Sequence, residues 1–175
     1  MSDCKTTINY ESGHEYVDLG LSVKWATCNV GAESPDGYGR RYICCKDKKQ
    51  AYDTVNFKWH GRWRMPSVEE FRELIDSCTY EWEEHDGVRG IRFTSTKPGL
   101  EGKSIFLRAS GFFDIDDDGP YEYGMYLTAN LSSNEVSQSQ QAQILTFEKG
   151  ISSKVEFSFM SHDLYPWACV RPVFS

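Results

Sequence analysis

The sequence contains no run of eighteen apolar residues, which is about the length that a membrane-spanning helix needs. No membrane span is therefore expected. The first five residues also contain no apolar core of the kind that a signal peptide carries. Either the protein is made without export or a targeting segment has been removed. In the second case we expect an extracellular or cell-surface location.

The chain has no excess of positive charge. Its 19 lysines and arginines stand against 26 acidic residues, a formal net charge of -7. An acidic surface argues against binding to a phosphate backbone, so no nucleic-acid partner is expected. One basic cluster is the exception, and it is interpreted as a solvated loop or as a contact for a polyanion. It comprises Arg40, Arg41, Lys46, Lys48 and Lys49.

Several catalytic and metal-binding motifs are missing. There is no C-x-x-C pair, no H-E-x-x-H, no G-x-S-x-G and no glycine-rich phosphate loop. Cys28, Cys78 and Cys169 lie in apolar patterns and are predicted to be small buried residues. A disulfide among them stays open if the protein is extracellular.

What the chain does have is the composition of a folded domain. Its 175 residues include 14% aromatics, enough for one domain with a sizeable core. Residues 1–13 are polar and are predicted to form a flexible tail. Residues 14–175 are predicted to form a single domain.

One amphipathic helix is predicted after Pro66. Ser67 followed by Glu70 forms a capping box, and apolar residues then recur at helical spacing. The members of that apolar stripe are Val68, Phe71, Leu74, Ile75 and Cys78.

Short strands are predicted through the rest of the chain. Residues 80–83 and 88–93 flank Asp86-Gly87 and indicate a hairpin. Many short, mostly antiparallel strands with one main helix and long loops indicate an α+β fold. The other predicted strands are 15–19, 22–28, 104–107, 123–128, 143–148, 154–159 and 167–174.

Several of these segments resemble a known family. Residues 15–32 read EYVDLGLSVKWATCNVGA, followed by Trp-Arg-Met-Pro at 63–66, by 104–107, and by Val-Arg-Pro-Val at 170–173. In this order they resemble the Fibrobacter succinogenes major paralogous domain, which is abundant in Bacteroidetes. The resemblance covers residues 14–174. It implies a C-type lectin-like fold, in the branch of the formylglycine-generating enzymes and the variable proteins of diversity-generating retroelements.

The sequence departs from the family pattern in two places. Residues 41–46 read RYICCK where the family has a Tyr-Tyr-Ala-Trp-Gly-Glu-like segment. Residues 127–133 read LTANLSS where a Trp-Ser-Ser is usual. Both departures fall in regions that would otherwise belong to the frame, so the local structure there is less well specified.

A ligand-binding surface is predicted in the segment 130–167. Uncharged polar residues dominate its first part, and Tyr and Trp follow, a composition typical of recognition surfaces. The resemblance also implies a variable binding surface near the C-terminus. The predicted ligand-binding residues are Asn130, Asn134, Gln138, Gln141, Gln143, His162, Asp163, Tyr165 and Trp167.

A calcium loop is the only cofactor site that the sequence suggests. Asp114, Asp116 and Asp118 precede Gly119 as in a calcium-binding loop. Met125 stands where a bidentate Glu would be expected, which favours a solvated acidic turn. The Glu-Pro-Asn and Gln-Pro-Asp tripeptides of calcium-dependent lectins are absent.

Three functions follow from this reading. The first is a non-enzymatic recognition domain that binds a surface protein or glycan in adhesion, with retroelement-driven variation as an extension. The second is a thiol-dependent enzyme of the formylglycine-generating-like branch, with Cys169 or the Cys44-Cys45 pair near a histidine. The third is a structural subunit of a surface or phage assembly.

Overall fold

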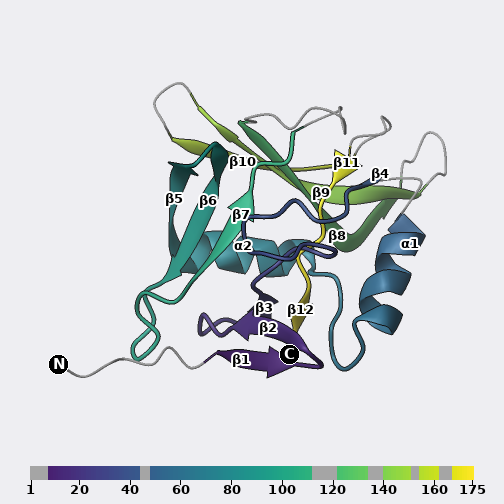
Figure 1. The fold of residues 1–175 in the computed structure, drawn as a ribbon. Coiled ribbons are helices and arrows are strands. Elements are labelled where there is room, and N and C mark those ends of the chain that lie inside the picture. The colour runs from purple at the N-terminus through teal and green to yellow at the C-terminus, as the bar shows by residue number, and fades with distance from the viewer. Residues whose placement is uncertain (1–7, 44–47, 112–121, 134–139, 151–153, 162–166) are drawn as a thin grey trace.

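The computed structural model describes most of the chain. The described residues are 8–43, 48–111, 122–133, 140–150, 154–161 and 167–175. Short antiparallel strands and two helical segments fill these ranges, so the predicted α+β class is confirmed (Figure 1). In the described part of the chain, no helix is long and apolar enough to cross a membrane.

The first sheet joins the beginning and the end of the domain. It contains β1 (Asn9–Glu11), β2 (His14–Val17), β3 (Lys24–Ala26) and β12 (Val173–Phe174), in that order. Figure 1 shows the C-terminal end of the chain beside β1 and β2.

β1 corrects the predicted boundary of the tail. Residues 9–11 were expected to be flexible, yet they form a strand in register with β2. Two tertiary contacts hold that strand in place. The indole of Trp63 donates to the carbonyl of Glu11 (2.8 Å), and Arg62 forms an ion pair with the Glu11 carboxylate (3.1 Å). Residues 1–7 lie outside the described ranges.

The second sheet contains the predicted hairpin. β5 (Cys78–His85) pairs with β6 (Val88–Ser95), which pairs with β7 (Ser104–Arg108). Asp86 and Gly87 both have positive φ, as the type I′ turn of a two-residue hairpin requires. The three central residues of β7 are buried, so its prediction as a strand is confirmed.

The third sheet carries much of the C-terminal half. β8 (Tyr123–Ser133) pairs with β9 (Gln140–Lys149), and β9 pairs with β10 (Val155–Ser161). The register of β8 and β9 shifts between Leu127 and Leu131, which marks an irregularity of the bulge type.

The main helix, α2 (Val68–Ser77), forms as predicted, except that Cys78, the last residue of the predicted apolar stripe, begins β5. The hydroxyl of Ser67 accepts from the backbone N–H of Glu70 (3.2 Å), and the Glu70 carboxylate accepts from the N–H of Ser67 (2.8 Å). Val68, Phe71 and Leu74 are buried. α2 packs against β5 and β6 of the second sheet and β8 and β9 of the third (Figure 1). It therefore fixes those two sheets relative to each other.

A second helical segment was not predicted. α1 (Lys48–Asp53) continues into the π-helix η1 (Thr54–Lys58), in place of the solvated loop expected around the basic cluster. Ala51, Val55 and Trp59 are buried. Their spacing of four residues is a helical signal that the lysine-rich composition obscured.

The closing segment 167–174 is two strands and not one. β11 (Trp167–Ala168) pairs with β4 (Tyr42–Ile43), and β12 pairs with β3. Arg171 and Pro172 separate them, since proline cannot donate to a strand ladder. Between the two strands, the N–H of Cys169 donates to the carbonyl of Met125 in β8 (2.9 Å).

Candidate functional site

Most of the residues predicted to bind a ligand lie outside the described part of the chain. Asn134, Gln138, His162, Asp163 and Tyr165 are among them. So are the three aspartates of the predicted calcium loop, which are Asp114, Asp116 and Asp118. Gln141 lies in β9 opposite Ser132. These positions remain predictions.

Asn130, in contrast, has a structural task. Its side-chain oxygen accepts from the backbone N–H of Val68 (2.9 Å), one of the N–H groups that the start of α2 leaves without a helical partner. Thr128 connects it to Gln143: the Thr128 hydroxyl donates to the Gln143 carbonyl (2.8 Å) and accepts from the Asn130 N–H (3.2 Å). Asn130 therefore belongs to the frame that supports α2.

Trp167 lies apart from that pair. It is half-buried in β11, where it pairs with Ile43 of β4. Trp167 therefore belongs to the two-stranded sheet of β4 and β11. Of the predicted residues that the structure describes, Asn130 and Gln143 come together, and Trp167 sits in a different sheet.

The clearest concave feature of the described surface is a groove between β5 and β10. Its volume is about 460 Å³, within the range of ligand-binding clefts. Three residues of β5 and the turn side of the β9–β10 hairpin form its walls. The lining residues are Tyr80, Glu81, Trp82, Lys149, Lys154 and Val155.

Aromatic rings connect the two walls of this groove. The rings of Tyr80 and Phe157 meet edge to face with centroids 5.0 Å apart, and those of Trp82 and Phe147 lie 6.4 Å apart. Tyr80 is 38% exposed. The indole nitrogen of Trp82 is buried, and within the described residues it has no hydrogen-bond partner. An unsatisfied buried donor is costly, so the indole N–H adds nothing to the stability of this wall.

The charges at the groove are not all neutralised within the protein. On β5, Glu83 pairs with Arg92 (2.8 Å) and Glu84 pairs with Arg89 (3.0 Å). Lys149 and Lys154 line the end of the groove nearest the β9–β10 turn, and Glu81 is the only acidic residue in the described lining. This end therefore favours a ligand that carries negative charge.

A separate hollow of about 200 Å³ lies on the third sheet. At its rim, a hydrogen bond with Glu148 raises the pKa of Tyr123, whose side chain is 47% exposed. On the neighbouring position of β8, Gly124 makes room for the ring of Phe147, because a Cβ there would collide with it.

Sequence analysis did not identify this groove. Tyr80 and Trp82 were interpreted only as part of a hairpin, and residues 154–159 as an ordinary strand. Their alternation places Tyr80 and Trp82 on the same face of β5, a signal that was available. Nothing in the sequence indicated that β5 and β10 would border one cleft.

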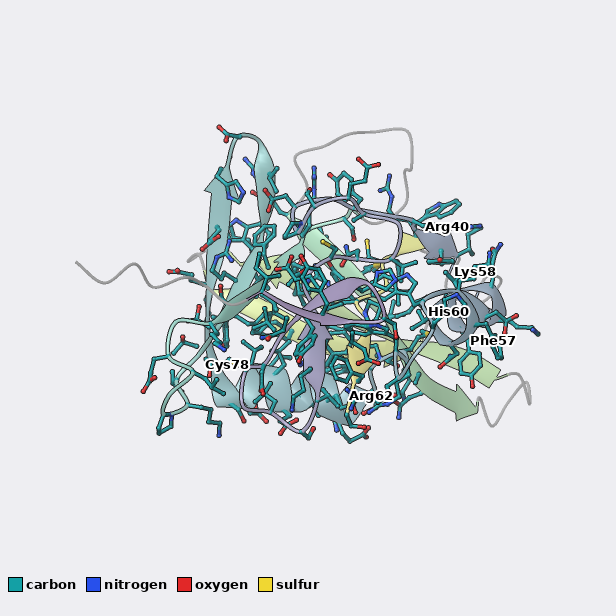
Figure 2. The ribbon with its side chains drawn as sticks, turned by 60° about the horizontal axis from the view of Figure 1, so that its bottom comes forward. Arg40, Phe57, Lys58, His60, Arg62 and Cys78 are labelled. Atoms are coloured by element: carbon teal, nitrogen blue, oxygen red, sulfur yellow. The ribbon has the colours of Figure 1, made fainter. Side chains whose placement is uncertain are left out.

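The basic residues around η1 form a separate region. Figure 2 shows Arg40, Phe57, Lys58 and His60 on one side of the molecule, away from Cys78 at the start of β5. Phe57 is 64% exposed. Nearby acidic groups offset part of the charge, since Lys49 pairs with Asp53 and Arg62 with Glu11. This region is therefore a weaker candidate than the groove.

Comparison with known proteins assigns no family. No protein-family model, curated protein or solved structure matches the chain. The resemblance to the Fibrobacter succinogenes domain thus rests on sequence motifs, and function has to be inferred from the geometry of the site.

The described cysteines are buried or half-buried free thiols. Cys78 and Cys169 are buried as predicted, Cys28 is half-buried, and no disulfide joins the three. The Cys169 thiol donates to the carbonyl of Tyr38 (3.4 Å), and no histidine of the described ranges contacts it. Burial raises its pKa to about 11. A nucleophilic thiolate needs the opposite shift, which disfavours Cys169 in that role.

This shift predicts an alkaline loss of stability. Cys169 keeps its proton in the folded protein up to about pH 11, whereas an unfolded thiol loses it near pH ~8.5. The stabilisation is complete below that lower value and is lost as the pH rises through the higher one. Urea unfolding between these values should show a decline of up to ~1.4 kcal/mol per pH unit from this group.

Cys169→Ala is the matched variant, and its free energy of unfolding should decline less steeply with pH over the same range. It should not vanish, because burial also raises the pKa of Tyr126 and of Cys78. An identical pH dependence in both proteins would contradict the assignment.

The described residues contain no group of three or more His, Cys, Asp and Glu side chains that could hold a metal ion.

Proposed function

We propose that this chain is a non-enzymatic recognition domain with a C-type lectin-like fold, related to the Fibrobacter succinogenes major paralogous domain. It binds a protein or glycan on a cell or host surface, through a face to which β5 and the C-terminal half of the chain both contribute. The observation that carries the proposal is the groove between β5 and β10, where exposed aromatic and basic side chains line one cleft.

The composition of the groove suits recognition. Tyr and Trp present large, rigid apolar surfaces at a low cost in conformational entropy, and they dominate the energetics of many binding sites. Lys149 and Lys154 add charge that can orient a ligand. Such a mixture of aromatic anchors and polar edges binds either a sugar face or a polypeptide.

The frame behind the groove is well fixed. α2 packs against both sheets that border the cleft, and the first and last described strands are held in one sheet. A stiff frame limits the ordering cost of binding. These features support a domain that displays a binding surface over a constant scaffold.

The proposal is tested by removing the aromatic wall. A glycan and surface-protein array should identify a ligand, and Tyr80→Ala should then weaken its binding about tenfold or more, as expected for a central anchor. Tyr10→Ala is the matched control, since Tyr10 is 61% exposed in β1. Equal affinity of both variants and the wild type would exclude the groove as the binding site.

The retroelement extension needs a different measurement. A near-copy of the DNA that encodes residues 126–173, next to the gene and a reverse transcriptase, would support it.

A further inference from the structure

The backbone of β5 has a free edge at the groove. β5 is an end strand of its sheet. In a two-residue hairpin the pair that flanks the turn, here His85 and Val88, is hydrogen-bonded, and bonded pairs then alternate. By that alternation the N–H and C=O groups of Tyr80 and Trp82 point away from β6. In agreement with this alternation, the carbonyl of Arg89 in β6 accepts a hydrogen bond from the N–H of Ala109, on the side of β7 and not of β5.

β10 offers a second free edge. It too is an end strand. The N–H of Gly150 donates to the carbonyl of Lys154 (2.9 Å), which marks a bonded pair at the turn, and the N–H of Lys149 is turned toward the β8 side. The alternation therefore directs the backbone groups of Val155 and Phe157 away from β9.

Both free edges border the same groove. Tyr80 and Trp82 line it from β5, Val155 lines it from β10, and the ring contact between Tyr80 and Phe157 joins the two strands. In the described part of the chain β5 pairs only with β6 and β10 only with β9. Outward backbone donors and acceptors of both strands thus lie beside the cleft.

We propose that the occupant of the groove is an extended segment of a partner protein, which adds as a strand and pairs its backbone with these edges. An acidic side chain of that segment contacts Lys149 and Lys154, and an apolar one packs on Tyr80. This inference rests on the proposed recognition function and names its ligand class.

Two observations favour a polypeptide over a glycan. Alternating N–H and C=O groups are complemented by another strand, whereas a sugar offers hydroxyls at no fixed repeat. In addition, β5 is eight residues long, which is enough for a partner strand of about six residues to pair along it.

The test uses synthetic peptides about six residues long, or ~20 Å of strand, in which Val alternates with Asp. Their affinity for the full chain is measured by fluorescence anisotropy. A strand that lies between two edges directs one alternate set of its N–H groups to β5 and the other set to β10. N-methylation of either set should therefore abolish binding, and binding that survives N-methylation of either set would overturn the inference.

The protein side is tested with two prolines. Val155→Pro removes an outward N–H and should weaken peptide binding about five- to tenfold, the effect of one lost hydrogen bond. Glu84→Pro is the control, on the free edge of β5 but outside the groove lining, and should bind like the wild type. If Val155→Pro fails to fold, the two N-methylated series still decide the question.

The remaining outcomes separate this inference from the proposed function. If glycans bind in a manner sensitive to Tyr80→Ala and no peptide of the panel binds, the strand inference is wrong and the recognition function stands. If neither class binds, both are wrong. A third outcome is that the peptides do not bind, the chain self-associates, and Tyr80→Pro in β5 abolishes that self-association. The occupant of the groove would then be a second copy of the chain, and the inference would be wrong.

Discussion

Replacing Arg171 with methionine should destabilise the protein by about 3–5 kcal/mol, because it leaves several buried hydrogen-bond acceptors without a donor, at about 1–3 kcal/mol each. The Arg171 side chain is fully buried. It donates to the side-chain oxygen of Asn29 (2.8 Å) and to the carbonyls of Ala26 (3.2 Å), Thr27 (3.0 Å) and Phe106 (2.8 Å). Methionine is similar in length but leaves these four acceptors unsatisfied. Urea unfolding followed by tryptophan fluorescence measures the loss.

The matched control is Arg72→Met. Arg72 is exposed on α2 and lies over the ring of Phe159, so its replacement should cost less than about 1 kcal/mol. A wild-type unfolding midpoint for Arg171→Met would show that the buried network contributes nothing. The network joins the closing segment to the end of β3 and to β7. Its loss should therefore increase protease cleavage near β3 and β7 as well as in the closing segment.

Phe71→Ala should destabilise the protein by a similar amount, about 3–5 kcal/mol. Phe71 is fully buried on α2, with its ring centroid 5.1 Å from that of Trp25 and 6.5 Å from that of Tyr126. These neighbours come from distant parts of the chain and are themselves completely buried. They have little freedom to move into the space, so a cavity should remain and add to the lost burial of the ring.

Asp76→Ala provides the comparison for that variant. Asp76 lies on the exposed face of the same helix, and alanine has the higher helix propensity, so stability should change by less than about 0.5 kcal/mol. A smaller effect for Phe71→Ala than for Asp76→Ala would mean that α2 is not held by its apolar stripe.

The two predictions concern the frame and not the ligand. Neither Arg171 nor Phe71 lines the groove. Their variants should therefore lose binding only in proportion to the unfolded fraction, while Tyr80→Ala should lose more affinity than its unfolded fraction explains. Measuring both quantities for all three variants separates the scaffold from the binding surface.

Local patterns predicted the elements that depend on neighbouring residues. The capping box at Ser67, the apolar stripe of α2 and the Asp86-Gly87 turn all formed as expected, because their hydrogen bonds and packing faces are set within a few positions. Predictions failed where a distant contact decided the structure. The strand at Asn9–Glu11 is held by Trp63 and Arg62.

The sequence by itself determined the α+β class, the main helix, the hairpin and the position of most strands, because propensity, capping and periodicity act over short distances. Only the tertiary structure decided that Asn130 caps α2, that Arg171 sits in a cage of carbonyls, and that β5 and β10 border one groove. Those arrangements depend on which strand ends a sheet and where α2 places each sheet. Contacts between residues far apart in the chain fix both, and no local pattern encodes them.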